Sequence, residues 1–318
     1  MISYLIRRVA QAVAVVILAS FLVFGIMHWL PGDPILMYMT SDQYHQHTQA
    51  EINQMRHEYG LDKPVLVQYV DWLGNVLHGD FGKSIIKGTS VAADLKQALP
   101  VSLYVGLAAF IFAHLIGIPL GILCAIRRGK WIDSLFTALA NLGMTVPVFW
   151  LGYLLIFLFA LKLHWLPSFG YVSPFKDLGM SVKELIMPAF CLALVPLAGS
   201  TRQTRSAMLD IIHQDYIRTA WAKGLRERTV VARHVIRNGI LPVVTLSGMA
   251  VPMVIGGSVL VENVFSLPGV GALATNALFT KDYAEVQGVV LVIAIIVVFM
   301  NLIVDISYGY LDPRVRLS

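Results

Sequence analysis

Charged side chains are scarce in this chain of 318 residues. Asp, Glu, Lys and Arg together make up 14% of it, whereas about 25% is usual for soluble domains. Hydrophobic residues make up 57%. A water-soluble globule of this length needs more polar surface than that. The scarcity of charge therefore excludes an ordinary soluble enzyme, a disordered segment and a secreted disulfide scaffold, and it indicates an integral membrane protein.

Reactive groups arranged for catalysis are also lacking. The sequence contains no CxxC, HExxH or GxSxG pattern, and its two cysteines, Cys124 and Cys191, lie in apolar runs as small packing residues. Gly82-Lys83-Ser84 resembles the end of a phosphate-binding P-loop, but the glycine that this motif requires five positions earlier is Leu77. We therefore expect no enzymatic activity, no bound cofactor and no metal site in this chain.

The sequence does contain several long stretches without a charged residue. A helix needs about 20 apolar residues to cross the bilayer core. Six charge-free runs are candidates: Val9–Gly32, Gln97–Ile126, Ser134–Leu161, Leu185–Thr201, Asn238–Val261 and Val286–Val304. They predict an all-α integral membrane fold with six transmembrane helices. The fourth run is the shortest, and Pro188 and Pro196 predict that it is irregular.

A seventh charge-free run, Asn263–Thr280, differs from the others in composition. It contains Pro268, Gly269 and Gly271, which are typical of turns. We expect a loop or a shallow re-entrant segment there.

The placement of the basic residues predicts the orientation. If the N-terminus is cytoplasmic, most of the 24 Lys and Arg residues fall on the inner side and most of the 19 acidic residues fall outside. Cytoplasmic segments are enriched in Lys and Arg, so both termini are expected inside. The basic balance is then a result of topology, and no nucleic-acid partner is expected. The first run is longer than a secretory signal and is expected to be an uncleaved signal anchor.

Four regions follow from this topology. Residues 1–30 form an N-terminal membrane helix, 31–97 an external region, 98–305 a core of five membrane helices, and 306–318 a cytoplasmic tail. Two short amphipathic helices are predicted in the external region, at Glu51–Tyr59 and Val65–Leu77.

The inner loop 202–237 carries a third amphipathic helix, with apolar residues at intervals of three and four. One interpretation is a surface helix held by membrane lipid headgroups. The other is a docking element for a cytoplasmic partner, which Gly224 favours because glycine ends a helix or permits close backbone approach.

Polar groups inside the predicted spans are candidates for a transport path. His114 and Asn141 are of this kind, and Met144 and Phe149 are grouped with them as candidate path residues. A hydrogen bond between helices is the alternative role for the two polar side chains. Proline in several spans is compatible with bent helices around a pore, which leaves a channel, a secondary carrier and a pump subunit open.

The inner loop resembles a known signature. Arg218-Thr219-Ala220, then Gly224 and Leu241-Pro242, are similar to the cytoplasmic EAA loop of ABC importer permeases. Arg218 replaces the glutamate of the general pattern, and the spacing from Gly224 to Pro242 is longer. Both departures resemble the dipeptide, oligopeptide and nickel branch.

Short motifs throughout the chain resemble the same branch. They are Pro31-Gly32-Asp33-Pro34, Leu61-Asp62-Lys63-Pro64, Gly79-Asp80-Phe81-Gly82, Pro147-Val148-Phe149-Trp150, Trp165-Leu166-Pro167, Glu262-Asn263-Val264-Phe265, Pro268-Gly269-Val270-Gly271 and Leu311-Asp312-Pro313-Arg314. The chain is similar to the first of the two permeases in such systems. The resemblance implies one N-terminal helix followed by a five-helix type I importer core.

The resemblance also implies a mechanism and a set of partners. A second homologous permease would complete the path, and two cytoplasmic ATPases, which hold the ATP and Mg²⁺, would grip a coupling helix on each permease. An extracytoplasmic binding protein would deliver the solute at a bacterial or archaeal cell membrane. The expected coupling residues are Asp215, Tyr216, Ile217, Arg218, Thr219, Ala220, Trp221, Lys223, Gly224 and Leu225. Ile217, Ala220 and Trp221 would fill the ATPase groove, with Arg218 and Lys223 at its rim.

Peptides are the expected cargo of this permease. The nearest alternative is nickel or a metal–chelator complex, which His45, His47 and His57 on the external region favour slightly. A membrane protein that only senses peptide, and a membrane enzyme, are alternatives of other classes.

Overall fold

The computed structural model describes residues 2–29, 49–58, 62–84, 86–248 and 258–311. Over these residues the regular secondary structure is helical, with turns and loops between the helices and one isolated bridge between Lys83 and Ser90. It divides into two compact units: unit 1 comprises Met1–Ile6, Ser102–Leu267 and Phe299–Ser318, and unit 2 comprises Arg7–Val101 and Pro268–Val298. The all-α expectation is confirmed for the described part of the chain.

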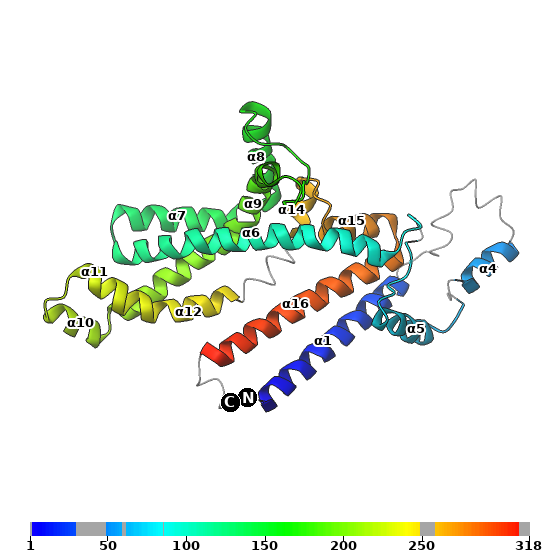
Figure 1. The fold of residues 1–318 in the computed structure, drawn as a ribbon, viewed down its shortest axis with the longest axis horizontal. Coiled ribbons are helices and arrows are strands. Elements are labelled where there is room, and N and C mark those ends of the chain that lie inside the picture. The colour runs from blue at the N-terminus through cyan, green and yellow to red at the C-terminus, as the bar shows by residue number, and fades with distance from the viewer. Residues whose placement is uncertain (1, 30–48, 59–61, 85, 249–257, 312–318) are drawn as a thin grey trace. The chain divides into compact units, whose positions relative to one another are not determined.

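Among the described residues, four single helices are long and apolar enough to cross a membrane. They are α1 (Ile2–Trp29), α6 (Val91–Ile126), α9 (Leu178–Ile212) and α16 (Tyr283–Leu311) (Figure 1). They correspond to the first, second, fourth and sixth predicted spans. The fifth predicted span begins with α12 (Arg237–Gly248) and ends in α14 (Ser258–Val264), and its middle lies outside the described residues.

The third predicted span is broken into two helices. α7 (Trp131–Thr145) is followed by α8 (Val148–Leu155) and the π-helical segment η1 (Ile156–Lys162), with a bend of 104° between the two halves. Pro147 explains the break, because it lacks a backbone N–H and disfavours helical torsions in the residue before it. Val146 is accordingly extended, with φ −74° and ψ 125°.

The expected irregularity of the fourth span was wrong, because α9 is one continuous helix through Pro188 and Pro196. In the run Asn263–Thr280 the expected turn lies around Ser266, where φ is +50°, and α15 (Val270–Thr280) then forms a short apolar helix where a loop was one of the two expectations. The other, a shallow re-entrant segment, stays a prediction. A glycine at the helix start, Gly269, supplies the extended N-cap backbone.

The two short helices predicted in region 31–97 have almost the predicted bounds. α4 spans Gln49–Glu58 and α5 spans Val65–Leu77. In unit 2, α5 packs on α1 through rings and hydroxyls: Tyr69 lies edge-on to Phe24 with a centroid distance of 5.5 Å, and its hydroxyl is 2.8 Å from that of Ser20. His28 of α1 also lies 3.0 Å from the amide oxygen of Gln68.

Unit 1 is organised around α9. It packs against α7 on one side and α12 on another. Its most apolar stretch is 39% buried, compared with 11% for α1 and for α16, so α9 is the most enclosed of the long helices.

Glycines let α6 approach α9 closely. A Cβ on Gly121 of α6 would lie 2.5 Å from the carbonyl oxygen of Thr201, and one on Gly117 would lie 2.9 Å from that of Leu197. This is the close packing that a GxxxG pattern permits between membrane helices.

Candidate coupling site

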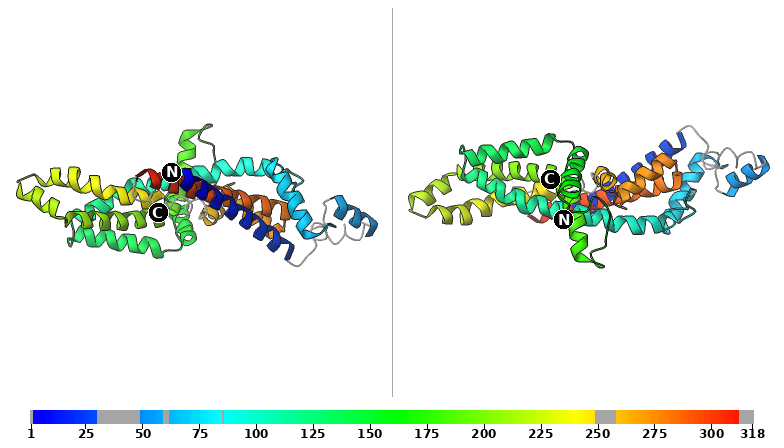
Figure 2. Two further views of the ribbon diagram at one scale, coloured as in Figure 1. Left: turned by 90° about the horizontal axis from the view of Figure 1, so that it is seen from below. Right: turned by 90° about the horizontal axis from the view of Figure 1, so that it is seen from above.

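The loop 202–237 folds into a helical tip at one end of unit 1. After α9 ends at Ile212, a short turn leads into α10 (Asp215–Ala222), and α11 (Glu227–Val230) continues through the π-helical segment η2 (Val231–Ile236) into α12. Figure 1 and both views of Figure 2 show this tip in yellow-green, projecting past the adjoining ends of α6 and α7. The predicted coupling residues thus share one short helix and the turn after it.

One face of α10 is buried within the chain itself. Ile217 is fully buried and Ala220 is 7% exposed, and both belong to a cluster with Met208 of α9 and Val230 of α11. The structure therefore places Ile217 and Ala220 elsewhere than expected. They attach α10 to α9 and do not project outward to fill a partner's groove.

The rest of the α10 surface is exposed and mixed in character. Tyr216 and Trp221 are exposed side chains on either side of the buried stripe, and Leu225 is exposed in the turn after the helix. Asp215 and Arg218 lie 3.5 Å apart on the surface, and Asn238 of α12 donates a 3.1 Å hydrogen bond to the hydroxyl of Tyr216. The exposed surface of α10 and of the turn after it thus combines charged and aromatic side chains.

Gly224 ends α10. Its φ is +78°, its N–H donates to the carbonyl of Trp221, and the N–H of Leu225 donates to that of Ala220. These two bonds form a Schellman cap, in which glycine avoids the strain of the left-handed conformation. Of the two roles expected for Gly224, the structure gives it the helix-ending one, and Lys223 is the C-cap residue before it.

The candidate path residues lie on three helices. His114 is half-buried on α6 and bonds to the carbonyl of Phe110 in its own helix, at 2.8 Å. Asn141 and Met144 are exposed on α7, and Phe149 is exposed on α8 beyond the 104° bend. The structure does not gather His114 with the other three into one cluster of contacts.

One ion pair within unit 1 was not predicted from the sequence. Asp133, at the start of α7, accepts two bonds from Arg205 of α9, from Nε at 2.7 Å and from a terminal nitrogen at 2.9 Å. Each residue reads in the sequence as an ordinary charge at the edge of an apolar run. Asp133 and Arg205 are 72 positions apart in the sequence, and only the fold brings them into contact. The GxxxG pattern of Gly117 and Gly121, by contrast, was present in the sequence and could have been found.

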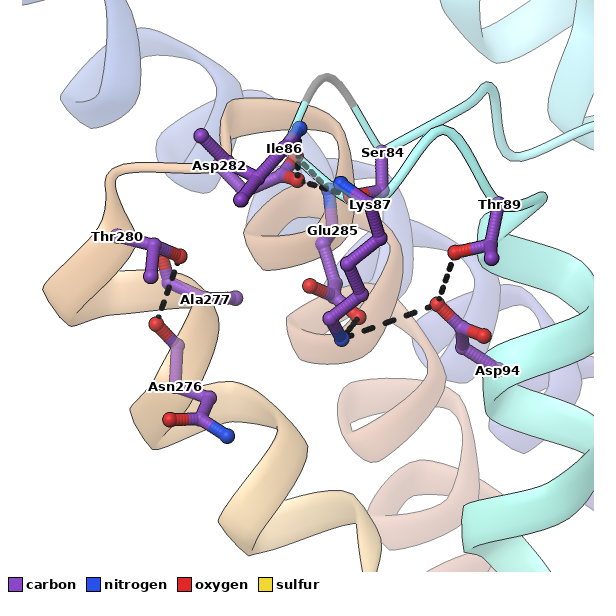
Figure 3. A network of polar contacts seen from close by, with 10 residues as sticks. All are labelled: Ser84, Ile86, Lys87, Thr89, Asp94, Asn276, Ala277, Thr280, Asp282 and Glu285. Atoms are coloured by element: carbon purple, nitrogen blue, oxygen red, sulfur yellow. Dashed lines mark hydrogen bonds and ion pairs between the residues drawn. The ribbon is translucent and has the colours of Figure 1, made fainter. Parts of the chain in front are cut away.

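A second polar network lies in unit 2, where the turn before α6 meets the start of α16 (Figure 3). Lys87 lies 2.6 Å from Glu285 and 3.8 Å from Asp94. The hydroxyl of Ser84 donates to Asp282, which is buried. The sequence drew attention to Gly82-Lys83-Ser84 as a P-loop fragment, and the structure instead uses Ser84 to fasten this turn to α16.

Comparison with known proteins identifies the family. Residues 117–317 match the family described as "Binding-protein-dependent transport system inner membrane component", and residues 1–104 match the N-terminal family of the same systems. The oligopeptide transport system permease protein AppB of Bacillus subtilis is 41% identical over 99% of this chain and 100% of its own length. The di/tripeptide transport system permease protein DppB of Pseudomonas aeruginosa is 34% identical over 99% of both chains.

Solved structures share the fold. An inward-facing structure of the MetNI methionine ABC transporter superposes with a TM-score of 0.55 at 19% identity, covering 69% of this chain and 96% of that one. An amino acid ABC transporter gives a TM-score of 0.51 at 15% identity, with 69% and 94% covered. From the matched family, the full-length relatives and the shared type I fold, we conclude that the chain belongs to the binding-protein-dependent transport system inner membrane components, the permeases of ABC importers.

Proposed function

We propose that this chain forms half of the translocation path of an ATP-driven importer for di- or oligopeptides in a bacterial or archaeal cell membrane. A second homologous permease completes the path, two cytoplasmic ATPases bind ATP and Mg²⁺, and an extracytoplasmic binding protein delivers the peptide. The single observation that carries the cargo assignment is the full-length similarity to permeases named for oligopeptide and di/tripeptide transport.

The nickel alternative has less support. His57, one of the three histidines that suggested it, lies 2.7 Å from Asp62 and lowers the pKa of that carboxyl through a hydrogen bond. His45 and His47 lie outside the described residues. The relatives reported above are named for peptides, which favours the peptide assignment.

Uptake by the complete complex tests the proposed function. The chain, its partner permease, both ATPases and the binding protein would be reconstituted in proteoliposomes with ATP inside the compartment that holds the ATPases. We expect ATP-dependent accumulation of a labelled dipeptide or oligopeptide. Accumulation of nickel or a nickel chelate in place of peptide would contradict the cargo assignment.

The exposed face of α10 is the proposed contact with an ATPase. Binding of the ATPase buries Trp221, Tyr216 and Leu225, while Ile217 and Ala220 keep α10 fixed to α9. ATP drives the cycle only through its different affinity for the two conformations of the complex.

Replacing Trp221 by Glu is expected to weaken ATPase binding by about 2 kcal/mol or more, because buried aromatic residues dominate the energy of protein interfaces. Co-purification of the ATPases with the permease pair measures this effect. Phe175→Glu is the matched control, since Phe175 is 99% exposed in the loop between η1 and α9, on the opposite side in the predicted topology. Equal ATPase recovery from both variants would argue against the assigned face.

Reporter fusions test the proposed orientation. A fusion after Arg228 is expected to report a cytoplasmic position, and one after Leu77 an external position, because the basic residues concentrate in the inner loop. Alkaline phosphatase activity reports an external position, and fluorescence of green fluorescent protein reports a cytoplasmic one. The reverse pattern would overturn the topology.

A further inference from the structure

The ion pair of Asp133 and Arg205 joins two helices with bidentate geometry. Both oxygens of Asp133 accept from the Arg205 guanidinium, and one of them also accepts from the N–H of Gly129 at 3.0 Å. The side chains are 7% and 30% exposed. Bidentate geometry of this kind fixes orientation as well as distance. The pair therefore ties the turn between α6 and α7 to α9.

On α9, Arg205 lies next to the residue that meets the coupling helix. Met208 is three positions further on, so both side chains lie on the same side of the helix. Met208 is 1% exposed and belongs to the cluster that contains Ile217 of α10. A displacement of α10 thus acts on α9 one turn from the Arg205 guanidinium.

At its other end, α7 contacts α9 by apolar packing among the described residues. Gly143 faces Leu194, and a Cβ on Gly143 would lie 3.1 Å from Cγ of that leucine. Asn141 and Met144 flank this contact and are exposed. The ion pair that fixes the orientation of α7 on α9 is therefore in the first turn of α7. This is the end of α7 nearest the coupling helix.

We propose that the Asp133–Arg205 pair is the link that carries movement of α10, through α9, to α7 and its candidate path residues. Both are positioning residues, since neither is placed in contact with solute or ATP. This inference rests on the proposed function. A residue that only stabilised the fold would lower import and ATP hydrolysis together, whereas a loosened link lets ATP be hydrolysed without import.

Arg205→Lys is the primary test, because it keeps the charge and removes the bidentate geometry. In proteoliposomes holding the complete complex, ATP hydrolysis and peptide import would be measured in the same preparation. We expect ATP hydrolysis near the wild-type rate and a rise of about tenfold in ATP hydrolysed per peptide imported, within the usual range of coupling between sites. Arg202→Lys, at an exposed position one turn earlier on α9, is the matched control and should leave the ratio unchanged.

A second variant guards against loss of folding. Asp133→Asn with Arg205→Gln keeps two hydrogen-bonding side chains without buried charge, and it should raise the same ratio. In complexes that assemble normally, an unchanged ratio of ATP hydrolysed to peptide imported in either variant would overturn the link. A parallel fall in import and hydrolysis is one such outcome. Import by the wild-type complex in the same experiment tests the proposed function separately: its absence refutes that function, whereas its presence with an unchanged ratio refutes only the link.

Discussion

Adding one methyl group at Gly121 is expected to destabilise unit 1 by about 2–3 kcal/mol, the upper part of the range found for overpacked interiors. The Cβ of Gly121→Ala would lie 2.5 Å from the Thr201 carbonyl oxygen and 2.6 Å from Cβ of Thr204. Neither neighbour is the flexible end of a side chain, so α6 and α9 must separate. Thermal unfolding of the purified permease in detergent or nanodiscs measures the loss.

Gly199 of α9 provides the matched control. A Cβ there meets nothing within 4 Å. Gly199→Ala should therefore be neutral or stabilising by up to about 1 kcal/mol, through helix propensity alone. If both substitutions shifted the unfolding temperature in the same direction and to the same extent, close packing of α6 on α9 would not be what requires glycine at position 121.

Removing the Lys87 ammonium is the second change with a large expected effect. Glu285 is 1% exposed, and its Oε2 is buried without a hydrogen-bond partner among the described residues, so Lys87 supplies the charge that faces it. Breaking a buried ion pair leaves an uncompensated charge. Because Lys87 is itself 38% exposed, solvent screens part of the effect, and we expect Lys87→Met to destabilise unit 2 by about 2–3 kcal/mol.

The same network offers a rescue and a control. Glu285→Gln in the Lys87→Met background removes the stranded charge and should restore most of the lost unfolding temperature. Lys83→Met alters an exposed lysine of the same turn and should have little effect. Failure of the double variant to recover would mean that the Lys87 ammonium acts through Asp94, 3.8 Å away, and not through Glu285.

Charge-free runs predicted the long helices well, because the cost of placing charge in the bilayer constrains the sequence over some twenty consecutive positions. α5 and α10 were predicted because apolar residues recur on one helical face. A bend at Pro147 was among those that proline in several spans made possible, but Pro188 and Pro196 present the same local signal within a continuous helix. The local sequence alone therefore does not distinguish a proline that bends a span from one that a continuous helix accommodates.

The coupling site was likewise predicted only in part from the sequence. Periodicity identified the stripe containing Ile217 and Ala220, but a stripe does not reveal what covers it. The structure shows that the cover is the chain's own α9 and α11. Contacts such as Asp133 with Arg205 join residues far apart in sequence, and no local pattern encodes them.

The length of α9 bears on what α10 meets. From Arg202, the first charge after the apolar stretch, the helix continues to Ile212, which at about 1.5 Å per residue adds about 16 Å. The polar headgroup layer on one side of a bilayer is only about 5–8 Å thick. In the proposed orientation α10 would therefore lie in the aqueous phase, beyond the lipid headgroups. Its exposed aromatic side chains would then contact water until a partner binds them.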